Sequence, residues 1–293
     1  MRKHAYLIIA HKCDYTFKVL LELLDDFRND IYIHMDKKNH FFDETDVKLK
    51  KSKVYFLKRK SVTWGGYSQV DTELRLLKLA LKNGSYKYLH LLSGEDLPIK
   101  SQDTIHEYFD KVSGKEFIHF DNPIFKDYYR VNRYYWFQEI IGRNNTNGFV
   151  AKINEICLKL QDKLKVNRNA EIDFQKGSNW FSITGEFASY IVDSEKTIKR
   201  IFHSTMMSDE LFIQTVIINS VFRDSLGTGE FDNDYSKIKR LIDWKRGNPY
   251  IYRSEDYEEI LQSECFFARK FDALVDREII QKIKENILGK DRM

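Results

Sequence analysis

Four short clusters of polar and glycine residues suit the binding of a nucleotide. They are His11 with Lys12, His34 through Asp36, Trp64-Gly65-Gly66, and Ser93 through Pro98. All four fall at the carboxyl-end edge of an expected sheet, where open α/β folds bind ligands. A nucleotide there would find a carboxylate for its base or ribose at Asp36, a flat ring at Trp64, and glycines that let the backbone come close.

Each cluster also has a purely structural interpretation. An aspartate such as Asp36 at the end of a strand is more often a turn former or a helix cap. Gly65-Gly66 suits an ordinary turn, and 94–98 suits an ordinary loop. The edge that all four clusters share favours the binding interpretation.

Two further candidates lie downstream. Ser208-Asp209-Glu210 precedes an apolar helix, where acidic residues normally complement the helix dipole. The functional alternative is that Glu210 is held ionised there and acts as a general base. Arg269 and Lys270 stand among the aromatic residues of 266–272. Taken alone, this pattern is typical of basic side chains whose stems cover an apolar stripe while their charged ends reach solvent.

Standard phosphate and metal motifs are weak in this chain. It has no G-x-x-x-x-G-K-[ST] and no G-x-G-x-x-G after the first expected strand, which argues against a P-loop NTPase and a dinucleotide-binding dehydrogenase. His34 and Asp36 suit a divalent ion but have no obvious partner. Asp232-Asn233-Asp234 could bind Mg²⁺ or Mn²⁺, but its polar surroundings favour a solvent-exposed loop.

The order of expected elements predicts a largely parallel sheet with helices on both faces. Short apolar runs predict buried strands at 6–10, 31–35, 54–57, 88–92 and 117–120. A shorter strand is expected at 180–183. Helices are expected around 103–112, 150–165, 186–201, 208–221 and 273–287.

Two more helices are expected between the early strands. The first carries an apolar face made by Phe17, Leu20, Leu21, Leu24 and Phe27. The second is opened by Ser68 and Asp71, which resemble a capping box, and is ended by Asn83-Gly84.

Length and composition predict one packed domain. The 293 residues are 42% hydrophobic and 14% aromatic with 3 Pro, which excludes disorder and low-complexity sequence. Since no internal repeat or clear linker is found, we expect a single domain over 1–293, with a regular half at 1–122 and a more irregular half at 123–293.

Charge, hydropathy and cysteine content indicate the partners and the cellular compartment of the protein. The net charge of +4 is small and evenly scattered, which disfavours a nucleic-acid partner. No apolar run reaches the roughly 20 residues of a membrane span, and the apolar stretch after Arg2 and Lys3 is too short for a signal peptide. The 3 cysteines are far apart and indicate a reducing compartment. We therefore expect a soluble protein of the cell interior.

Taken in order, these clusters resemble the core-2/I-branching β-1,6-N-acetylglucosaminyltransferase family (glycosyltransferase family 14), which also includes the peptide O-xylosyltransferases. The matching segments cover nearly the whole chain: LIIAHK at 7–12, YIHMDK at 32–37, SVTWGGYSQV at 61–70, LHLLSGEDLPIKS at 89–101, GSNWFSI at 177–183, SDELF at 208–212 and FFARKFD at 266–272. The segments at 94–100 and 266–272 are quite specific, whereas His-x-Asp and Gly-Ser-x-x-Phe are weak singly.

The resemblance implies a GT-A-like α/β fold with a mostly parallel, Rossmann-like sheet. It also implies an inverting transfer from a UDP-sugar to a sugar hydroxyl that needs no metal. Glu210 matches the catalytic base. Lys270 matches a lysine that contacts the donor diphosphate, a task shared by an upstream arginine, for which Arg246 is the candidate and Lys245 or Arg253 the alternatives.

The resemblance also divides the remaining site residues between the two substrates. The nucleotide-sugar half is 1–122 and the acceptor and catalytic half is 123–293. Donor binding is expected of His11, Asp36, Trp64, Gly65, Gly94 and Asp96. Acceptor binding is expected of Arg130, Arg133, Trp180 and Trp244.

We therefore expect a UDP-sugar substrate, most simply UDP-GlcNAc, no cofactor, no metal and no nucleic acid. The acceptor is expected to be a glycan or a lipid-linked oligosaccharide. Because the chain lacks the anchor, stem and paired cysteines of eukaryotic relatives, it resembles a bacterial, cytoplasmic member acting in surface polysaccharide synthesis, with peripheral contact at the inner face of the membrane left open. The alternatives are a UDP-xylose-dependent enzyme of the same fold and a non-catalytic glycan-binding module that uses 128–137.

Overall fold

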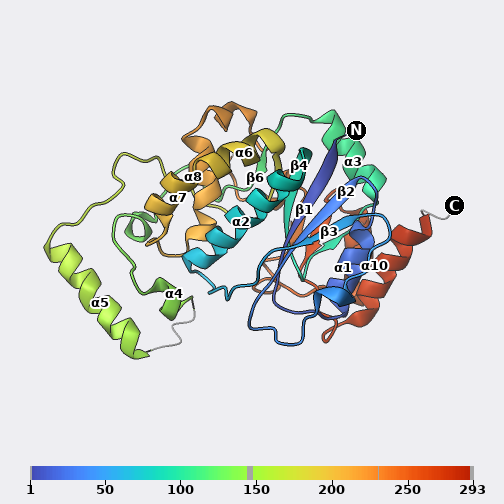
Figure 1. Cartoon of the computed structure of the whole chain (residues 1–293), viewed down its shortest axis with the longest axis horizontal. Coiled ribbons are helices and arrows are strands. Elements are labelled where there is room, and N and C mark those ends of the chain that lie inside the picture. The colour runs from blue at the N-terminus through green and yellow to red at the C-terminus, as the bar shows by residue number, and fades with distance from the viewer. Residues whose placement is uncertain (1, 144–147, 230, 291–293) are drawn as a thin grey trace.

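A twisted six-stranded sheet forms the centre of the computed structural model, which describes residues 2–143, 148–229 and 231–290 (Figure 1). Its strand order is β3-β2-β1-β4-β7-β6. The strands are β1 (Lys3–Ala10), β2 (Asn29–Met35), β3 (Lys53–Phe56), β4 (Tyr86–Ser93), β6 (Phe117–Ile118) and β7 (Phe181–Thr184). The first four pair in parallel, whereas β7 runs antiparallel to β4 and β6. The expected α/β architecture with a mostly parallel sheet is confirmed.

A second, three-stranded sheet lies against the first and was not expected. It consists of β5 (Leu97–Pro98), β9 (Phe267–Arg269) and β8 (Arg240–Ile242), with β9 in the middle. Strands of two and three residues are too short to show a hydrophobic period in the sequence. This sheet carries Arg269 to the loop that follows β4.

Helices cover both faces of the central sheet. They are α1 (Tyr15–Leu24), α2 (Tyr67–Asn83), α3 (Gln102–Lys111), α4 (Gln138–Ile141), α5 (Gly148–Lys163), α6 (Gly185–Asp193), α7 (Glu195–Phe202), α8 (Phe212–Ile218), α9 (Tyr257–Gln262) and α10 (Arg277–Lys290). In the described ranges, none is both long and apolar enough to cross a bilayer.

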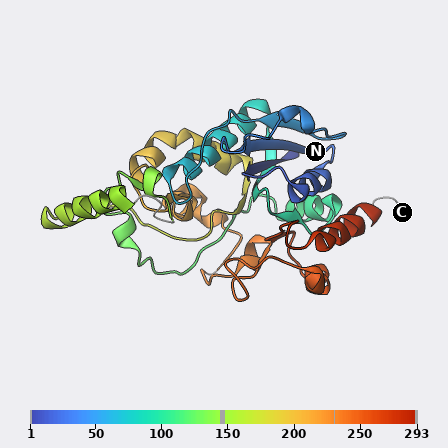
Figure 2. The ribbon, with the colours of Figure 1, turned by 90° about the horizontal axis from the view of Figure 1, so that it is seen from below.

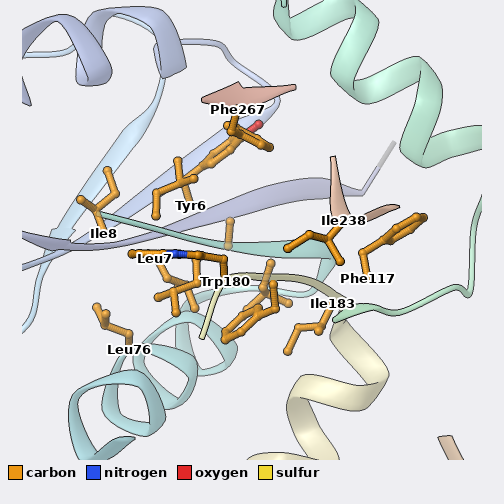
Figure 3. Close-up of a cluster of buried hydrophobic side chains, with 14 of the residues drawn as sticks. Tyr6, Leu7, Ile8, Leu76, Phe117, Trp180, Ile183, Ile238 and Phe267 are labelled. Carbon is orange, nitrogen blue, oxygen red and sulfur yellow. The ribbon is translucent and has the colours of Figure 1, made fainter. Parts of the chain in front are cut away.

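Alternating side chains of β1 build the core on both sides of the sheet (Figure 3). Tyr6 points toward Phe267 of the second sheet, and Leu7 points to the opposite side, toward Leu76 of α2. These residues and Ile183 of β7 belong to one cluster of buried side chains. The two sequence halves therefore share a single hydrophobic core.

Three local expectations were wrong. Helix α2 has Gly66 as its N-cap and no side-chain cap, because the Ser68 hydroxyl accepts instead from the Thr63 N–H at 2.8 Å. Phe27 lies beyond the end of α1 and is 68% exposed, so it is not part of the buried face. The helix expected over 186–201 is divided at Ser194 into α6 and α7.

Candidate active site

The carboxyl ends of β1, β2 and β4 meet at one edge of the sheet. Ala10 lies opposite Met35, and Ile9 lies opposite Ser93. The Asp36 N–H donates to the Ala10 carbonyl at 2.8 Å. The structure thus brings the clusters that follow these strands together, as the sequence predicted.

Asp36 joins this edge to the cluster at Trp64. Its nearly buried carboxylate accepts from the N–H groups of Lys38 at 2.8 Å and Val62 at 3.1 Å. The Trp64 ring is half exposed, and the Arg143 guanidinium lies 4.4 Å from its centre. Asp36 therefore fixes the loop that presents a flat ring to solvent.

Gly65 connects the same loop to the candidate base. Its φ of +80° lies in the left-handed region that favours glycine. Its carbonyl accepts from the N–H of Met207 at 3.1 Å, three residues before Glu210.

The turn after β4 is tightly built. A Cβ on Gly94 would stand 2.9 Å from the Cβ of Ala10, so the close approach to β1 requires glycine. Asp96 is buried and accepts from the N–H and hydroxyl of Ser93 at 2.7 and 2.8 Å. Burial raises the pKa of Asp96, although Arg269 opposes the rise. The buried Asp96 side chain therefore stabilises this turn through its hydrogen bonds to Ser93.

Three cationic side chains, which we call the cation cluster, pair with acidic residues of this turn: Lys12 and Lys270 with Glu95, and Arg269 with Asp96, whose Oδ1 is 3.3 Å from the Arg269 Nε. Lys270 Nζ is 2.9 Å from Glu95 Oε2, and Lys12 Nζ is 3.3 Å from Glu95 Oε1. Lys12 also pairs with Asp272 at 3.1 Å. His11 is more distant, with its Nε2 3.8 Å from Glu95 Oε1.

Three neighbouring basic side chains, those of Lys270, His11 and Lys12, lower the pKa of Glu95. Burial alone would raise the pKa of Glu95, but the hydrogen bond and charge of Lys270, with the charges of His11 and Lys12, hold it below its usual range. An entering anion would therefore compete with Glu95 for fixed positive charges.

Glu210 ends the short 3-10 helix Ser208–Glu210, and its side chain is 26% exposed. Arg130, which is buried, donates to Glu210 Oε2 at 3.0 Å and to the carbonyls of Met206 and Met207 at 3.1 and 2.6 Å. Arg130 thus orients the carboxylate and the loop before it. This contact differs from the acceptor role that the resemblance implied.

Two buried carboxyl groups lie behind Glu210. Burial and the charge of Glu210 raise the pKa of Asp209 to about 7. Burial, followed by the charge of Asp209, raises the pKa of Glu73 on α2 well above its usual value. Nothing in the sequence distinguishes Glu73, because it lies within an ordinary amphipathic helix.

The short segment from Gly177 to Trp180 connects Glu210 to Arg269 of the cation cluster. The Gly177 N–H donates to the Glu210 carbonyl at 3.0 Å. The ring of Trp180 lies 4.1 Å from the Arg269 guanidinium. Three residues span at most about 10 Å. The Glu210 backbone and the Arg269 guanidinium therefore contact the two ends of one short segment. The charges of both Glu210 and Arg269 also act on the pKa of Tyr235.

Trp244 and Arg133 occupy different surroundings. Trp244 is 44% exposed, and its ring lies 6.2 Å from that of Tyr235, close to this segment. Arg133 instead pairs with Asp162 of α5 at 3.1 Å. Trp180 is nearly buried beneath Arg269, so it supports the cation cluster.

Arg246, the predicted diphosphate-binding arginine, already has three acidic partners. Its guanidinium pairs with Asp243, Asp256 and Glu259. It also lies 4.2 Å from the ring of Tyr250, whose carbonyl accepts from the Lys270 N–H at 3.3 Å. The alternatives, Lys245 and Arg253, are both exposed. Arg269, rather than Arg246, is the arginine that belongs to the cation cluster. The sequence singles out Arg269 but predicts no role for it.

The Asp232–Asp234 motif lies on the surface. Asp232 pairs with Lys237, and the Asp234 carboxylate accepts from the Ser236 N–H at 2.8 Å, where it caps a 3-10 turn. In the described part of the chain, no three or more histidine, cysteine or acidic side chains are grouped so that they could hold a metal ion.

Comparison with known proteins decides the family. The family model described as Core-2/I-Branching enzyme matches residues 4–265. The chain belongs to this family. The resemblance found in the sequence motifs is therefore confirmed.

The sequence identity to individual known proteins is low. The chain is 23% identical over 281 residues to "Xylosyltransferase 1" of Mus musculus, covering 88% of this chain and 28% of that protein. It is 24% identical over 309 residues to "Xylosyltransferase 2" of Rattus norvegicus, covering 97% and 34%. The chain thus spans about a third of the length of these curated relatives. A crystal structure of mouse Xyloside xylosyltransferase 1, apo form, matches at 11% identity with a TM-score of 0.39, covering 92% of this chain and 97% of that one.

Proposed function

We propose that this chain is an inverting glycosyltransferase that moves a sugar from a UDP-sugar to a hydroxyl of a glycan acceptor. Membership of the Core-2/I-Branching enzyme family supports the reaction class. The observation that carries the proposal is the segment from Gly177 to Trp180, which contacts Glu210 at one end and Arg269 at the other. A candidate base and a cation held by the two ends of one short segment suit a displacement reaction.

The cation cluster would bind the donor diphosphate. A leaving UDP gains negative charge, which preorganised cations can offset. Arg269 supplies a planar fork for phosphate oxygens, and Lys12 and Lys270 supply point charges. The diphosphate would replace Glu95 as the partner of Lys270, which now lies 2.9 Å from Glu95. Independence from metal ions is part of this proposal.

Glu210 would act as the general base. It removes the proton from the acceptor hydroxyl as the oxygen attacks the anomeric carbon, and the bond from that carbon to the UDP oxygen breaks. One carboxylate suffices because the acceptor attacks directly and inverts the configuration. Arg130 would hold this carboxylate toward the acceptor, and the exposed ring of Trp244 is our candidate surface for an acceptor sugar.

The donor sugar is proposed as GlcNAc, with xylose as the second candidate. The family resemblance supports GlcNAc, whereas the names of the mouse and rat relatives support xylose. A cytoplasmic role in bacterial surface polysaccharide synthesis is the remaining part of this proposal.

Release of UDP from a panel of UDP-sugars, with water as acceptor, tests the function. We expect UDP release from UDP-GlcNAc above that from the other donors; preference for UDP-xylose would assign the alternative donor. Glycan binding that UDP does not alter, with no UDP release from any donor, would overturn the proposal and support a glycan-binding module.

A further inference from the structure

Helix α5 presents an apolar stripe to solvent. Phe149, Ile156 and Leu160 of α5 are 74%, 66% and 55% exposed, and Leu164, directly after the helix, is 67% exposed. With Ile153 they recur every three or four residues and cover an arc of about 80° on the helix. The helix stands away from the body of the molecule in both views (Figures 1 and 2).

Polar side chains connect the helix to the segment before it. Among the residues of α5, all within the described ranges, Gln161 is the buried one. Its side chain accepts from the Tyr134 N–H at 2.7 Å and donates to the Tyr134 carbonyl at 3.0 Å. Asp162 adds the ion pair with Arg133. Surface helices normally turn their apolar side to the core, so this outward stripe indicates a partner.

The charges beside the stripe indicate the chemistry of that partner. Lys152, Lys159 and Lys163 follow one border of the stripe, within about 60° of it on the helix. Residues 148–165 hold four lysines against Glu155 and Asp162, a net charge of 4 − 2 = +2. Lys159 also pairs with Glu155 at 2.7 Å, and both side chains are exposed. An apolar stripe bordered by lysines fits an anionic lipid surface.

Exposed aromatic residues lie in the segment that holds α5. Trp136 is 56% exposed and stacks on Tyr134, with 5.7 Å between ring centres. Tryptophan and tyrosine favour the boundary between membrane and water. Trp136 and Tyr134 therefore add to the apolar stripe of α5 two side chains that also favour a membrane surface.

We propose that α5 docks the protein on an anionic lipid surface, with the apolar stripe in the boundary between headgroups and acyl chains and the bordering lysines on the headgroups. The docking helix also lies beside the loop that leads to Glu210, the proposed base. Leu158 of α5 lines one hollow with Met206 and Met207, which lead to Glu210. A lipid-linked acceptor could then approach Glu210 from the bound surface, a consequence that rests on the proposed function.

Cosedimentation of the full chain with vesicles tests this inference. We expect binding to vesicles of phosphatidylcholine mixed with phosphatidylglycerol, and weaker binding to phosphatidylcholine alone or at high salt. Ile156→Glu with Leu160→Glu should weaken binding at least tenfold, because both side chains would enter the acyl boundary. Lys152→Glu with Lys163→Glu should weaken binding only to the anionic vesicles. Leu274→Glu is the matched control, since Leu274 is 92% exposed at another site, and it should bind like the wild type.

Three results would overturn the inference. The first is failure of the wild type to bind anionic vesicles. The second is equal binding by the wild type and the Ile156→Glu/Leu160→Glu protein. The third is a wild-type dimer, without vesicle binding, that this double variant dissociates, which would make a second copy the partner. UDP release from free UDP-sugar should be unchanged in all these variants. Vesicle binding without UDP release in the wild type would refute the enzyme function and leave the docking surface standing.

Discussion

Arg130 donates a hydrogen bond of 3.0 Å to Oε2 of Glu210 from a position that is 3% exposed. The same guanidinium binds the carbonyls of Met206 and Met207, so one buried cation fixes both the loop and the carboxylate at its end. This arrangement keeps a partly exposed carboxylate in one orientation.

Replacement of Glu210 tests its role as the base. Glu210→Gln keeps the shape and the contact with Arg130 but cannot accept the proton, so we expect turnover to fall at least ~10²-fold. UDP affinity, measured by calorimetry, should stay within a few-fold of the wild type. Turnover like that of the wild type would remove Glu210 from this role.

Replacement of Arg130 tests its role in positioning Glu210. Arg130→Gln leaves Glu210 and two carbonyls without their donor, so the free energy of unfolding should fall by about 3 kcal/mol. UDP release should fall by about 10- to 100-fold because the base loses its orientation. Denaturant titration and initial rates measure these effects.

Arg133→Gln is the matched control for Arg130→Gln. Arg133 pairs with the exposed Asp162, and such surface pairs contribute at most about 1 kcal/mol. Equal effects of the two substitutions on stability and rate would contradict the positioning role of Arg130.

Asp209 makes stability depend on pH. Its pKa of about 7 in the folded protein lies above the ordinary aspartate value of about 3.9. Between these values the folded state binds one proton more than the unfolded state. The contribution of Asp209 to the free energy of unfolding therefore falls as pH rises, by about 1.4 kcal/mol per pH unit, until pH exceeds about 7.

Asp209→Asn should remove this contribution. Denaturant titrations at several pH values between 5 and 7 should show a slope against pH that is less negative than that of the wild type by about 1.4 kcal/mol per unit. Asp173→Asn, at an exposed aspartate, should leave the slope unchanged. An unchanged slope in Asp209→Asn would mean that Asp209 is already ionised in the folded protein at pH 5.

The elements with a clear hydrophobic period were predictable from the sequence. The parallel strands β1 to β4 and helices α1, α2 and α3 fall close to the expected ranges, because buried apolar runs and helical stripes are local properties. The small sheet of β5, β9 and β8 was not predictable. The pairing of β5 with β9 joins residues more than a hundred positions apart, and all three strands are too short to show a hydrophobic period.

The same distinction applies to the candidate site. Gly94, Asp36 and Glu210 stand out by type and place, and the structure brings their clusters to connected loops. The partners of these residues could not be predicted. Arg130 reaches Glu210 across 80 positions, and Lys12 reaches Asp272 across 260. No short-range pattern specifies such ion pairs.

Calorimetric titration of UDP into the protein in the presence of EDTA is the most direct test that side-chain cations hold the donor diphosphate. We expect the wild type to bind UDP with the same affinity in EDTA as in Mn²⁺, and Lys270→Ala to bind at least tenfold more weakly, because one charge that offsets the diphosphate is lost. Binding that appears only with Mn²⁺, or equal affinity in Lys270→Ala, would contradict it.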